Sequence, residues 1–238
     1  MHRLATSIDS PWPGCRLWRI DLAQPVPAEA IARLSAQERA RADAFAFEQD
    51  RRRYLCAHAA LHGILCAVRG PRRAALAAEW RTGPFGKPAL ADAATPHFNL
   101  SHSGATGVVA VSDTHEVGVD IELLRPVPDA LDLSAAYFRA AEHAALQALP
   151  PALRATAFLR AWTRKEAVLK AVGTGLGLDP QTPYTGLDGD LARVQVPGPS
   201  GRQATVELAT LDLPGAIVSV ARCAVRAPAP VFAEAVPA

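Results

Sequence analysis

The sequence has 238 residues, half of them apolar, with 25 basic and 23 acidic side chains and a formal net charge of +2. This length suits one large domain or two small ones. The near balance of charge excludes bulk nucleic-acid binding by a polycation, and no apolar run approaches the length of a membrane span. We therefore expect neither nucleic acid nor a membrane as a partner.

The first part of the chain predicts a strand, then helices. Arg16–Ala23 alternates apolar and polar residues, as a half-buried strand does. Ser35, with Glu38 three residues later, forms the pattern of a capping box. A long helix is expected from about Asp50 to Val68, ending at the Gly-Pro pair at 70–71.

The middle of the chain predicts strands. "HFNLSHSG" is typical of a short strand that ends in a polar turn, and "RTGPFGKPAL" before it is typical of a loop. "GVVAVS" and "VGVDIELL" predict two strands that "DTHE" joins into a hairpin-like pair.

Two helices and three strands are expected after that. The helices fit Phe138–Leu149 and Pro151–Val172, and "GTGLG" ends the second one. The strands fit Leu191–Val196, Ala204–Leu211 and Ile217–Ala224.

This order indicates an α+β fold in two halves that meet near Glu116–Gly118. We take residues 1–116 as an N-terminal α/β half, 117–226 as a C-terminal α/β half, and the Pro/Ala-rich residues 227–238 as a flexible tail. The four cysteines form no C-x-x-C pair and no zinc spacing, and residues 1–15 contain no apolar signal region. These features predict a reduced, cytoplasmic chain.

The stretch "GVDIE" contains a pair of carboxylates. Because side chains alternate along a strand, Gly118, Asp120 and Glu122 share one face. Glycine would leave access to the two acids, and an all-oxygen set of this kind suits Mg²⁺, with Mn²⁺ as the open alternative. The other interpretation is an exposed strand face with solvated acids.

The helix "WTRKEAVLK" places charged residues on its apolar side. Lys165 falls in the middle of the arc that carries Trp162, and Glu166 and Lys170 fall at its edge, one turn apart. Glu166 would then add a third carboxylate, with both lysines near a metal-bound phosphate. Alternatively, Lys165 extends its head to water, and Glu166 and Lys170 form an ordinary i,i+4 pair.

A third group of residues is basic and glycine-rich. It comprises arginines at 39, 41 and 51–53, Lys87 in "GPFGKP", and Ser101 and His102 in "NLSHSG". Arg and Lys are the usual partners of phosphate. Each part alone is more typical of a solvated helix face or a structural histidine, but together they indicate a ligand with more than one phosphate.

Four segments together resemble one family. "FGKP", "FNLSHSG", "GVDIE" and "WTRKEAVLKAVGTGL" follow the order and spacing of Sfp-type 4′-phosphopantetheinyl transferases, over residues 33–178. The resemblance implies an enzyme that transfers the phosphopantetheine arm of coenzyme A (CoA) to a serine of an apo acyl or peptidyl carrier protein and releases 3′,5′-ADP. It also implies two similar α/β subdomains in a pseudo-twofold arrangement, with CoA between them, and a monomer.

The resemblance also implies roles for residues. Asp120, Glu122 and Glu166 would bind Mg²⁺, and Glu166, Lys170 and Lys165 would be catalytic, with Glu166 as the base. The implied contacts to CoA are Arg41, Arg53, Gly86, Lys87, Pro88, Ser101, His102, Lys165 and Lys170. Glu38 stands where some relatives have a basic residue, so that contact is missing or Arg39 replaces it.

Recognition of the carrier protein predicts a further surface. Arg160 and Arg164 are expected on the outer face of the catalytic helix, facing an acidic carrier, with apolar residues near Tyr137–Phe138 beside them. Two rival functions stay open: a Mg²⁺-dependent nuclease or phosphoesterase, and a CoA-binding regulator that has lost its activity.

Overall fold

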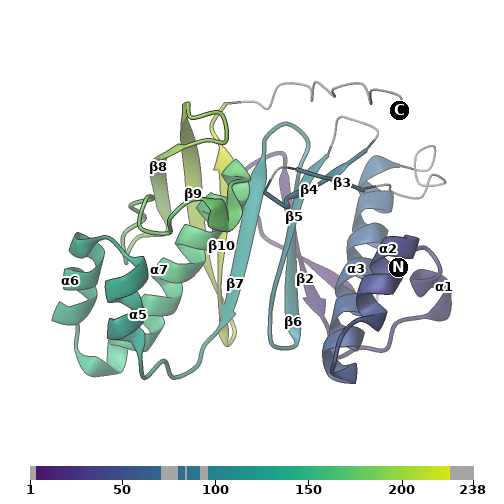
Figure 1. Cartoon of the computed structure of the whole chain (residues 1–238), viewed down its shortest axis with the longest axis horizontal. Helices are drawn as coiled ribbons and strands as arrows, with labels where there is room; N and C mark the ends of the chain where they lie inside the picture. The colour runs from purple at the N-terminus through teal and green to yellow at the C-terminus, as the bar shows by residue number, and fades with distance from the viewer. Residues whose placement is uncertain (1–3, 71–79, 84, 92–95, 226–238) are drawn as a thin grey trace.

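The computed structural model describes residues 4–70, 80–83, 85–91 and 96–225. Two four-stranded antiparallel sheets lie at the centre of the molecule, with strand orders β1-β2-β6-β5 and β7-β10-β9-β8. A long helix covers the outer side of each sheet, so that the layers run helix, sheet, sheet, helix (Figure 1). The predicted tail at 227–238 lies outside the described residues.

The first sheet contains strands from the N-terminal part of the chain alone. The elements of this part are β1 (Ala5–Ile8), β2 (Cys15–Asp21), α1 (Ala28–Ile31), α2 (Ala36–Asp43), α3 (Glu48–Arg69), β3 (Trp80–Thr82), β4 (Pro88–Leu90), β5 (His97–Ser103) and β6 (Thr106–Ser112). β3 and β4 form a separate two-stranded ribbon. The predicted capping box is confirmed, since Ser35 and Glu38 exchange both hydrogen bonds at the start of α2.

The second sheet contains the strands from residue 117 onward. The elements of this part are β7 (Val117–Leu123), α5 (Ala130–Tyr137), α6 (Ala140–Ala148), α7 (Pro151–Val172), a 3₁₀ turn (Gly175–Gly177), β8 (Leu191–Pro197), β9 (Gln203–Leu213) and β10 (Ala216–Cys223). The predicted bounds of α7 are confirmed: a proline begins the helix, and Gly173 ends it in the left-handed conformation, with φ of 77°.

Three apolar clusters hold these layers together. Ile20, Phe98 and Val109 lie with α3 residues in a cluster between α3 and the first sheet. Leu17 and Val119 belong to a cluster that joins the two sheets face to face. A further cluster packs α7 on β8, β9 and β10 of the second sheet. No helix among the described residues is long and apolar enough to cross a membrane.

The predicted hairpin of "GVVAVS" and "VGVDIELL" is wrong. β6 pairs with β2 and β5 in the first sheet, while β7 pairs with β10 in the second. The segment "DTHE" therefore connects the two sheets, and the hairpin lies between β5 and β6 instead, with Gly104 at φ of 55° in the turn.

β5 and β7 lie side by side at the seam between the sheets, and side chains of β5 hold them together. Asn99 accepts a hydrogen bond from the Val119 N–H at 2.8 Å, and Ser103 accepts one from the Leu123 N–H at 3.3 Å. These contacts bring the polar side of β7 next to "NLSHS" of β5.

Candidate functional site

The acidic face of β7 points toward α7. Val119 and Ile121 are buried between the sheets, which confirms that Asp120 and Glu122 lie on the opposite face. Gly118, which we expected to leave access to the acids, has a different role. A Cβ atom there would lie 2.2 Å from the Ala167 carbonyl oxygen, so glycine lets the backbone of α7 approach the strand.

Asp120 lies at the centre of a hydrogen-bonded group. Its Oδ1 atom accepts from the Lys170 ammonium at 2.6 Å and from the Ser101 hydroxyl at 2.7 Å. Lys170 also donates to Ser101 at 3.2 Å. Three elements, β5, β7 and α7, therefore meet at this carboxylate.

The other two predicted carboxylates lie around the same point. The Glu122 carboxylate accepts from the Ser103 hydroxyl at 2.9 Å, and Glu166 lies 4.0 Å from the Lys170 ammonium. Burial raises the pKa of Glu166; the Lys170 charge lowers it, and the charges of Asp120 and Glu122 raise it again. The structure thus brings Asp120 and Glu166 to Lys170, with Glu122 close enough to Glu166 to raise its pKa.

The chemistry of this group fits a hard divalent cation. Two of the three carboxylates contact Lys170, and the third, Glu122, lies 3.9 Å from Arg125. The raised pKa of Glu166 reflects burial and like-charge repulsion, both of which a bound cation would relieve. Within the described ranges, no three His, Cys, Asp or Glu side chains are already arranged to hold a metal ion. Asp120 and Glu122 would have to exchange Lys170 and Ser103 for the metal.

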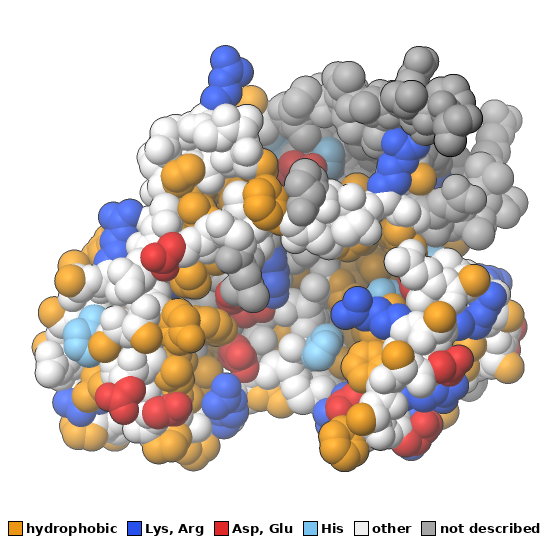
Figure 2. Space-filling view, viewed as in Figure 1, with side chains coloured by type: hydrophobic (Ala, Val, Ile, Leu, Met, Phe, Trp, Pro, Cys, Tyr) orange, Lys and Arg blue, Asp and Glu red, His pale blue; other side chains and the backbone are white. Residues whose placement is uncertain are grey.

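A second wall faces the carboxylates across a hollow. Figure 2 shows acidic side chains on one side of this hollow, a histidine inside it, and Lys or Arg side chains on the opposite lobe. His102, at the end of β5, lies between the walls: burial lowers its pKa, as do the charges of Lys170 and of Arg53 at the start of α3. Arg53 forms a local ion pair with Asp50 at 3.6 Å.

The loop with Gly86, Lys87 and Pro88 packs at the C-terminal end of α7 rather than beside the three carboxylates. The Lys87 ammonium binds the Glu116 carboxylate at 2.6 Å and the carbonyl oxygens of Val117 at 3.1 Å and Ala171 at 3.0 Å. Burial raises the pKa of Glu116, but His97 and Lys87 outweigh it and lower that pKa to about 2. Lys87 therefore binds the C-terminal end of α7, and none of these partners is a predicted site residue.

Lys165 is not brought to the carboxylate group. Its side chain is buried, and its ammonium lies 2.6 Å from the Glu142 carboxylate and donates to the Pro183 carbonyl oxygen at 2.7 Å. Burial lowers the pKa of Lys165, and the contact with Glu142 opposes that change. Lys165 thus faces inward as predicted, but toward α6 rather than toward Asp120.

The predicted outer face of α7 is wrong at Arg164. This residue is 1% exposed, and its guanidinium donates to the carbonyl oxygens of Thr185 and Gly189 and to the Thr210 hydroxyl. It holds the segment after α7 against the second sheet, where no carrier protein reaches it.

Of the other residues in the predicted docking surface, two lie toward the surface and one is buried. Arg160 lies toward the surface and binds Asp212 at 2.7 Å. Phe138 is 2% exposed and stacks on Phe158, which contradicts its place in a docking patch, whereas Tyr137 is 42% exposed.

The basic residues of α2 flank a buried acid. Arg41 is exposed in the last turn of α2, and Arg39 donates to the Leu34 carbonyl oxygen. Glu38 is buried between α2 and α3, where His58 and His62 bind its carboxylate. The position that we compared with a basic residue of relatives is therefore internal.

Three residues with roles in these contacts, Ser103, Asn99 and Glu142, were not predicted from the sequence. The first two could have been found, because in "NLSHS" the residues 99, 101 and 103 alternate as one polar face of a strand. Glu142 had no comparable signal, since nothing near it in sequence indicates Lys165 as its partner.

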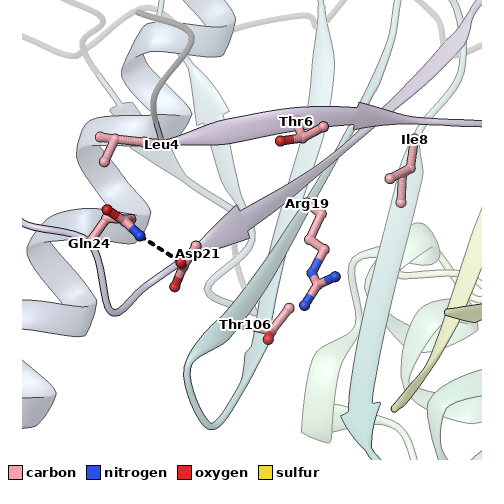
Figure 3. Close-up of a pocket in the computed structure, with 7 residues that line it drawn as sticks. All are labelled: Leu4, Thr6, Ile8, Arg19, Asp21, Gln24 and Thr106. Atoms are coloured by element: carbon pink, nitrogen blue, oxygen red, sulfur yellow. Dashed lines mark hydrogen bonds between the residues drawn. The ribbon is translucent and has the colours of Figure 1, made fainter. Parts of the chain in front are cut away.

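Two hollows of the first sheet contain none of the predicted site residues. The smaller, of about 490 Å³, opens on the sheet beside β1 (Figure 3) and is lined by Leu4, Thr6, Ile8, Arg19, Asp21, Gln24 and Thr106. The larger, of about 600 Å³, lies between α1, α3 and the strands β1 and β2, and Trp18, Gly63 and Ala67 line it.

Comparisons with known proteins show the family of this chain. Residues 116–217, which contain the three carboxylates, match the family model described as the 4′-phosphopantetheinyl transferase superfamily. The chain is 38% identical to 4′-phosphopantetheinyl transferase HetI of Nostoc sp., over 67% of this chain and 69% of that protein. It is 32% identical to 4′-phosphopantetheinyl transferase psf-1 of Bacillus pumilus, over 76% of this chain and 71% of that protein.

Proposed function

The chain belongs to the 4′-phosphopantetheinyl transferase superfamily, and from this premise we propose that it transfers the phosphopantetheine arm of CoA to a serine of an apo acyl or peptidyl carrier protein. The by-product is 3′,5′-ADP, and the reaction depends on Mg²⁺. One observation carries the proposal: Asp120 of β7 and Glu166 of α7 both pair with Lys170, and Glu122 lies near them on β7.

Asp120, Glu122 and Glu166 would hold the metal ion. When bound, Mg²⁺ neutralises charge on the pyrophosphate of CoA and on the phosphate that leaves. Ser101, whose hydroxyl donates to Asp120, holds this carboxylate in place for that purpose. Mn²⁺ is the alternative ion for the same oxygen ligands.

Glu166 is the proposed base. The serine oxygen of the carrier forms a bond to the β-phosphorus of CoA, and the bond from that phosphorus to the bridging oxygen breaks with its electron pair on 3′,5′-ADP. The serine proton passes to the Glu166 carboxylate, directly or through a water molecule. The route through water suits Glu166, since a carboxylate that also binds a metal ion is a weak base.

Lys170 is the proposed cation for the leaving phosphate. In the structure its ammonium lies within 2.6 Å of Asp120, which keeps it at the centre of the carboxylate group. Electrostatic contacts of this kind to developing charge typically change the rate about 10²–10³-fold. Lys165, which is occupied by Glu142, is proposed to position α7 rather than to touch the phosphates.

The nucleotide end of CoA is proposed to bind on the opposite wall. His102 lies within electrostatic range of Arg53 and also of Lys170 and Asp120, which supports a place for phosphate beside it. Arg41 extends this basic edge on α2, and Ser101 joins it to the carboxylates. Gly86, Lys87 and Pro88 are proposed to contribute through the loop that packs on the end of α7.

The remaining parts of the proposal concern the carrier protein, the cellular compartment and the oligomeric state. The carrier is proposed to approach the open side of the carboxylate group, with Tyr137 and Arg160 on the neighbouring surface. All four cysteines are free thiols, which agrees with a reaction in the reducing cytoplasm. One chain contains both walls of the site, so a monomer would suffice.

The test is transfer to an apo carrier protein. The protein is incubated with CoA, Mg²⁺ and the carrier, and the carrier is weighed by intact mass spectrometry. We expect a gain of one phosphopantetheine that EDTA abolishes and that Asp120→Ala and Glu166→Ala remove while both variants stay folded. Near-normal transfer by either folded variant would contradict the assignment of the site.

The same assay separates the two rivals. A nuclease or phosphoesterase would cleave nucleic acid or a phosphoester and leave the carrier unmodified. A regulator without activity would bind CoA and modify no acyl, aryl or peptidyl carrier.

A further inference from the structure

Glu38 is a buried carboxylate that the proposed reaction does not use. It is 5% exposed, and every oxygen has a partner: Oε2 accepts from the Ser35 N–H at 2.8 Å, and Oε1 binds Nδ1 of His58 at 2.7 Å. Nε2 of His62 lies 3.1 Å from both oxygens. The carboxylate thus joins the first turn of α2 to the middle of α3.

Besides this contact, the short helices α1 and α2 are attached to α3 by a partly exposed ion pair between Arg51 and Asp43 and by apolar packing. The apolar cluster between them and α3 contains only Leu34, Ala42 and Leu55 as buried members among the described residues. Because burying an ionised carboxylate costs several kcal/mol unless it is fully hydrogen-bonded, the contact is stable in one relative placement of α2 and α3 and unfavourable in others.

The helices that Glu38 joins carry the basic wall of the proposed site. α2 carries Arg41 in its last turn, and α3 carries Arg53 in its second turn. Arg53 acts electrostatically on His102, as does Lys170 from the carboxylate side. Because α3 is packed on the first sheet, the placement of α2 against α3 sets where Arg41 stands relative to Arg53, and so relative to Asp120 and Glu166.

The other half contains a matching contact. Glu142 is the third residue of α6, as Glu38 is of α2, and its carboxylate accepts from the Arg139 N–H at 3.1 Å as that of Glu38 does from the Ser35 N–H. Its carboxylate binds Lys165, which stands at the same position in the 22-residue helix α7 as His62 in the 22-residue helix α3. Each half thus uses a buried glutamate to attach a short helix to the long helix that carries site residues.

From this geometry we infer that Glu38, held by His58 and His62, is a positioning residue for CoA: it fixes α2 and α3 so that Arg41 and Arg53 meet the phosphates. This inference rests on the proposed function. Glu38 touches no substrate, so its loss changes how CoA binds and not how the bound molecule reacts.

The experiment compares Glu38→Gln with Glu29→Gln, the same chemical change at an exposed glutamate of α1. CoA binding is measured by titration calorimetry, and transfer is measured with CoA varied at a saturating carrier concentration. We expect Glu38→Gln to raise the Kd and KM for CoA about tenfold, as the loss of a residue that orients binding side chains typically does. The kcat should stay within about twofold of the wild-type value. Glu29→Gln should match the wild type.

A second variant covers the case in which Glu38→Gln does not fold. His58→Phe keeps a ring beside Tyr54 but removes the Nδ1 donor from a side chain that is 24% exposed, and it should raise the KM for CoA in the same direction. A folded Glu38→Gln variant with unchanged Kd and KM, or with a fall in kcat alone, overturns the positioning role. A wild-type protein that does not bind CoA refutes the proposed function itself.

Discussion

β2 and β7 occupy corresponding places in the two halves but carry opposite chemistry. Each has seven residues, packs one face between the sheets, and pairs with the last strand of its half. The face toward the long helix holds Trp18 and Ile20 in β2, but Asp120 and Glu122 in β7.

The long helices differ in the same way. Gly63 and Ala67 stand in α3 where Glu166 and Lys170 stand in α7. Trp18, Gly63 and Ala67 line an apolar hollow in the N-terminal half, while their counterparts form the carboxylate group. The difference teaches that the arrangement of sheet and helix supplies the place, and that a few side chains decide whether it is a site.

The largest expected effect tests whether chemistry belongs to one half alone. Asp120→Asn keeps the shape of the side chain and removes its charge, so transfer should fall at least about 100-fold, measured by carrier mass and initial rates. Trp18→Phe, at the corresponding position of β2, should retain transfer within about threefold. An equal loss in Trp18→Phe would mean that the apolar hollow also serves the reaction.

The second prediction concerns the close approach of α7 to β7. In Gly118→Ala the new Cβ would lie 2.2 Å from one backbone atom of α7 and 2.3 Å from another, so strand and helix must separate. We expect a loss of about 3 kcal/mol in stability and a large loss of transfer, measured by urea unfolding and rates.

A matched glycine in the other sheet provides the control. In Gly107→Ala the new Cβ would meet Ile20 and Leu22 at 3.5 Å, an ordinary contact. This variant should stay near wild-type stability, and a similar loss in both variants would contradict the special role of Gly118.

The third prediction separates catalysis from packing at Lys165. Lys165→Met leaves Glu142 buried without its cation, which should lower stability by about 3–5 kcal/mol. Because Gln keeps an oxygen for the Thr185 N–H, the double variant Glu142→Gln with Lys165→Met should recover much of that loss. Thermal unfolding and transfer rates measure both. A stable Lys165→Met variant without transfer would instead make Lys165 catalytic.

The smallest expected effect is the pH dependence of the stability that the two buried glutamates, Glu38 and Glu142, contribute. Burial raises the pKa of Glu38, but the hydrogen bonds with His58, His62 and Ser35 together lower it by more. Burial also raises the pKa of Glu142, but its hydrogen bonds, first of all the one with Lys165, lower it by more. Both pKa values are therefore below the ordinary value of 4.5. Each ionised carboxylate thus stabilises the folded state fully above about pH 4.5, and this stabilisation is lost as the pH falls through the lowered pKa.

The measurement is the melting temperature from pH 7 down to pH 3. The difference between the wild type and Glu38→Gln, or Glu142→Gln, should narrow by a few degrees below about pH 4.5. A difference that stays constant over this range would show that neither charge is linked to folding.

The local pattern of the sequence determined much of this protein. Alternation placed Asp120 and Glu122 together on β7, and helical periodicity placed Glu166 and Lys170 one turn apart on α7. Pro151 marked the start of α7, because the first residue of a helix needs no N–H for the helical hydrogen bonds. Gly173 marked its end, because glycine readily adopts the left-handed conformation found there.

Only the tertiary structure decided what those faces meet. Periodicity says which side of an element is covered, but not by which distant segment: β7 pairs with β10 rather than with β6, and Arg164 turns inward to Thr185. Long charged side chains are the least predictable, because their heads reach partners far away in sequence, as Lys165 reaches Glu142 and Lys87 reaches the end of α7. Buried charges need such partners, and folding alone brings them within reach.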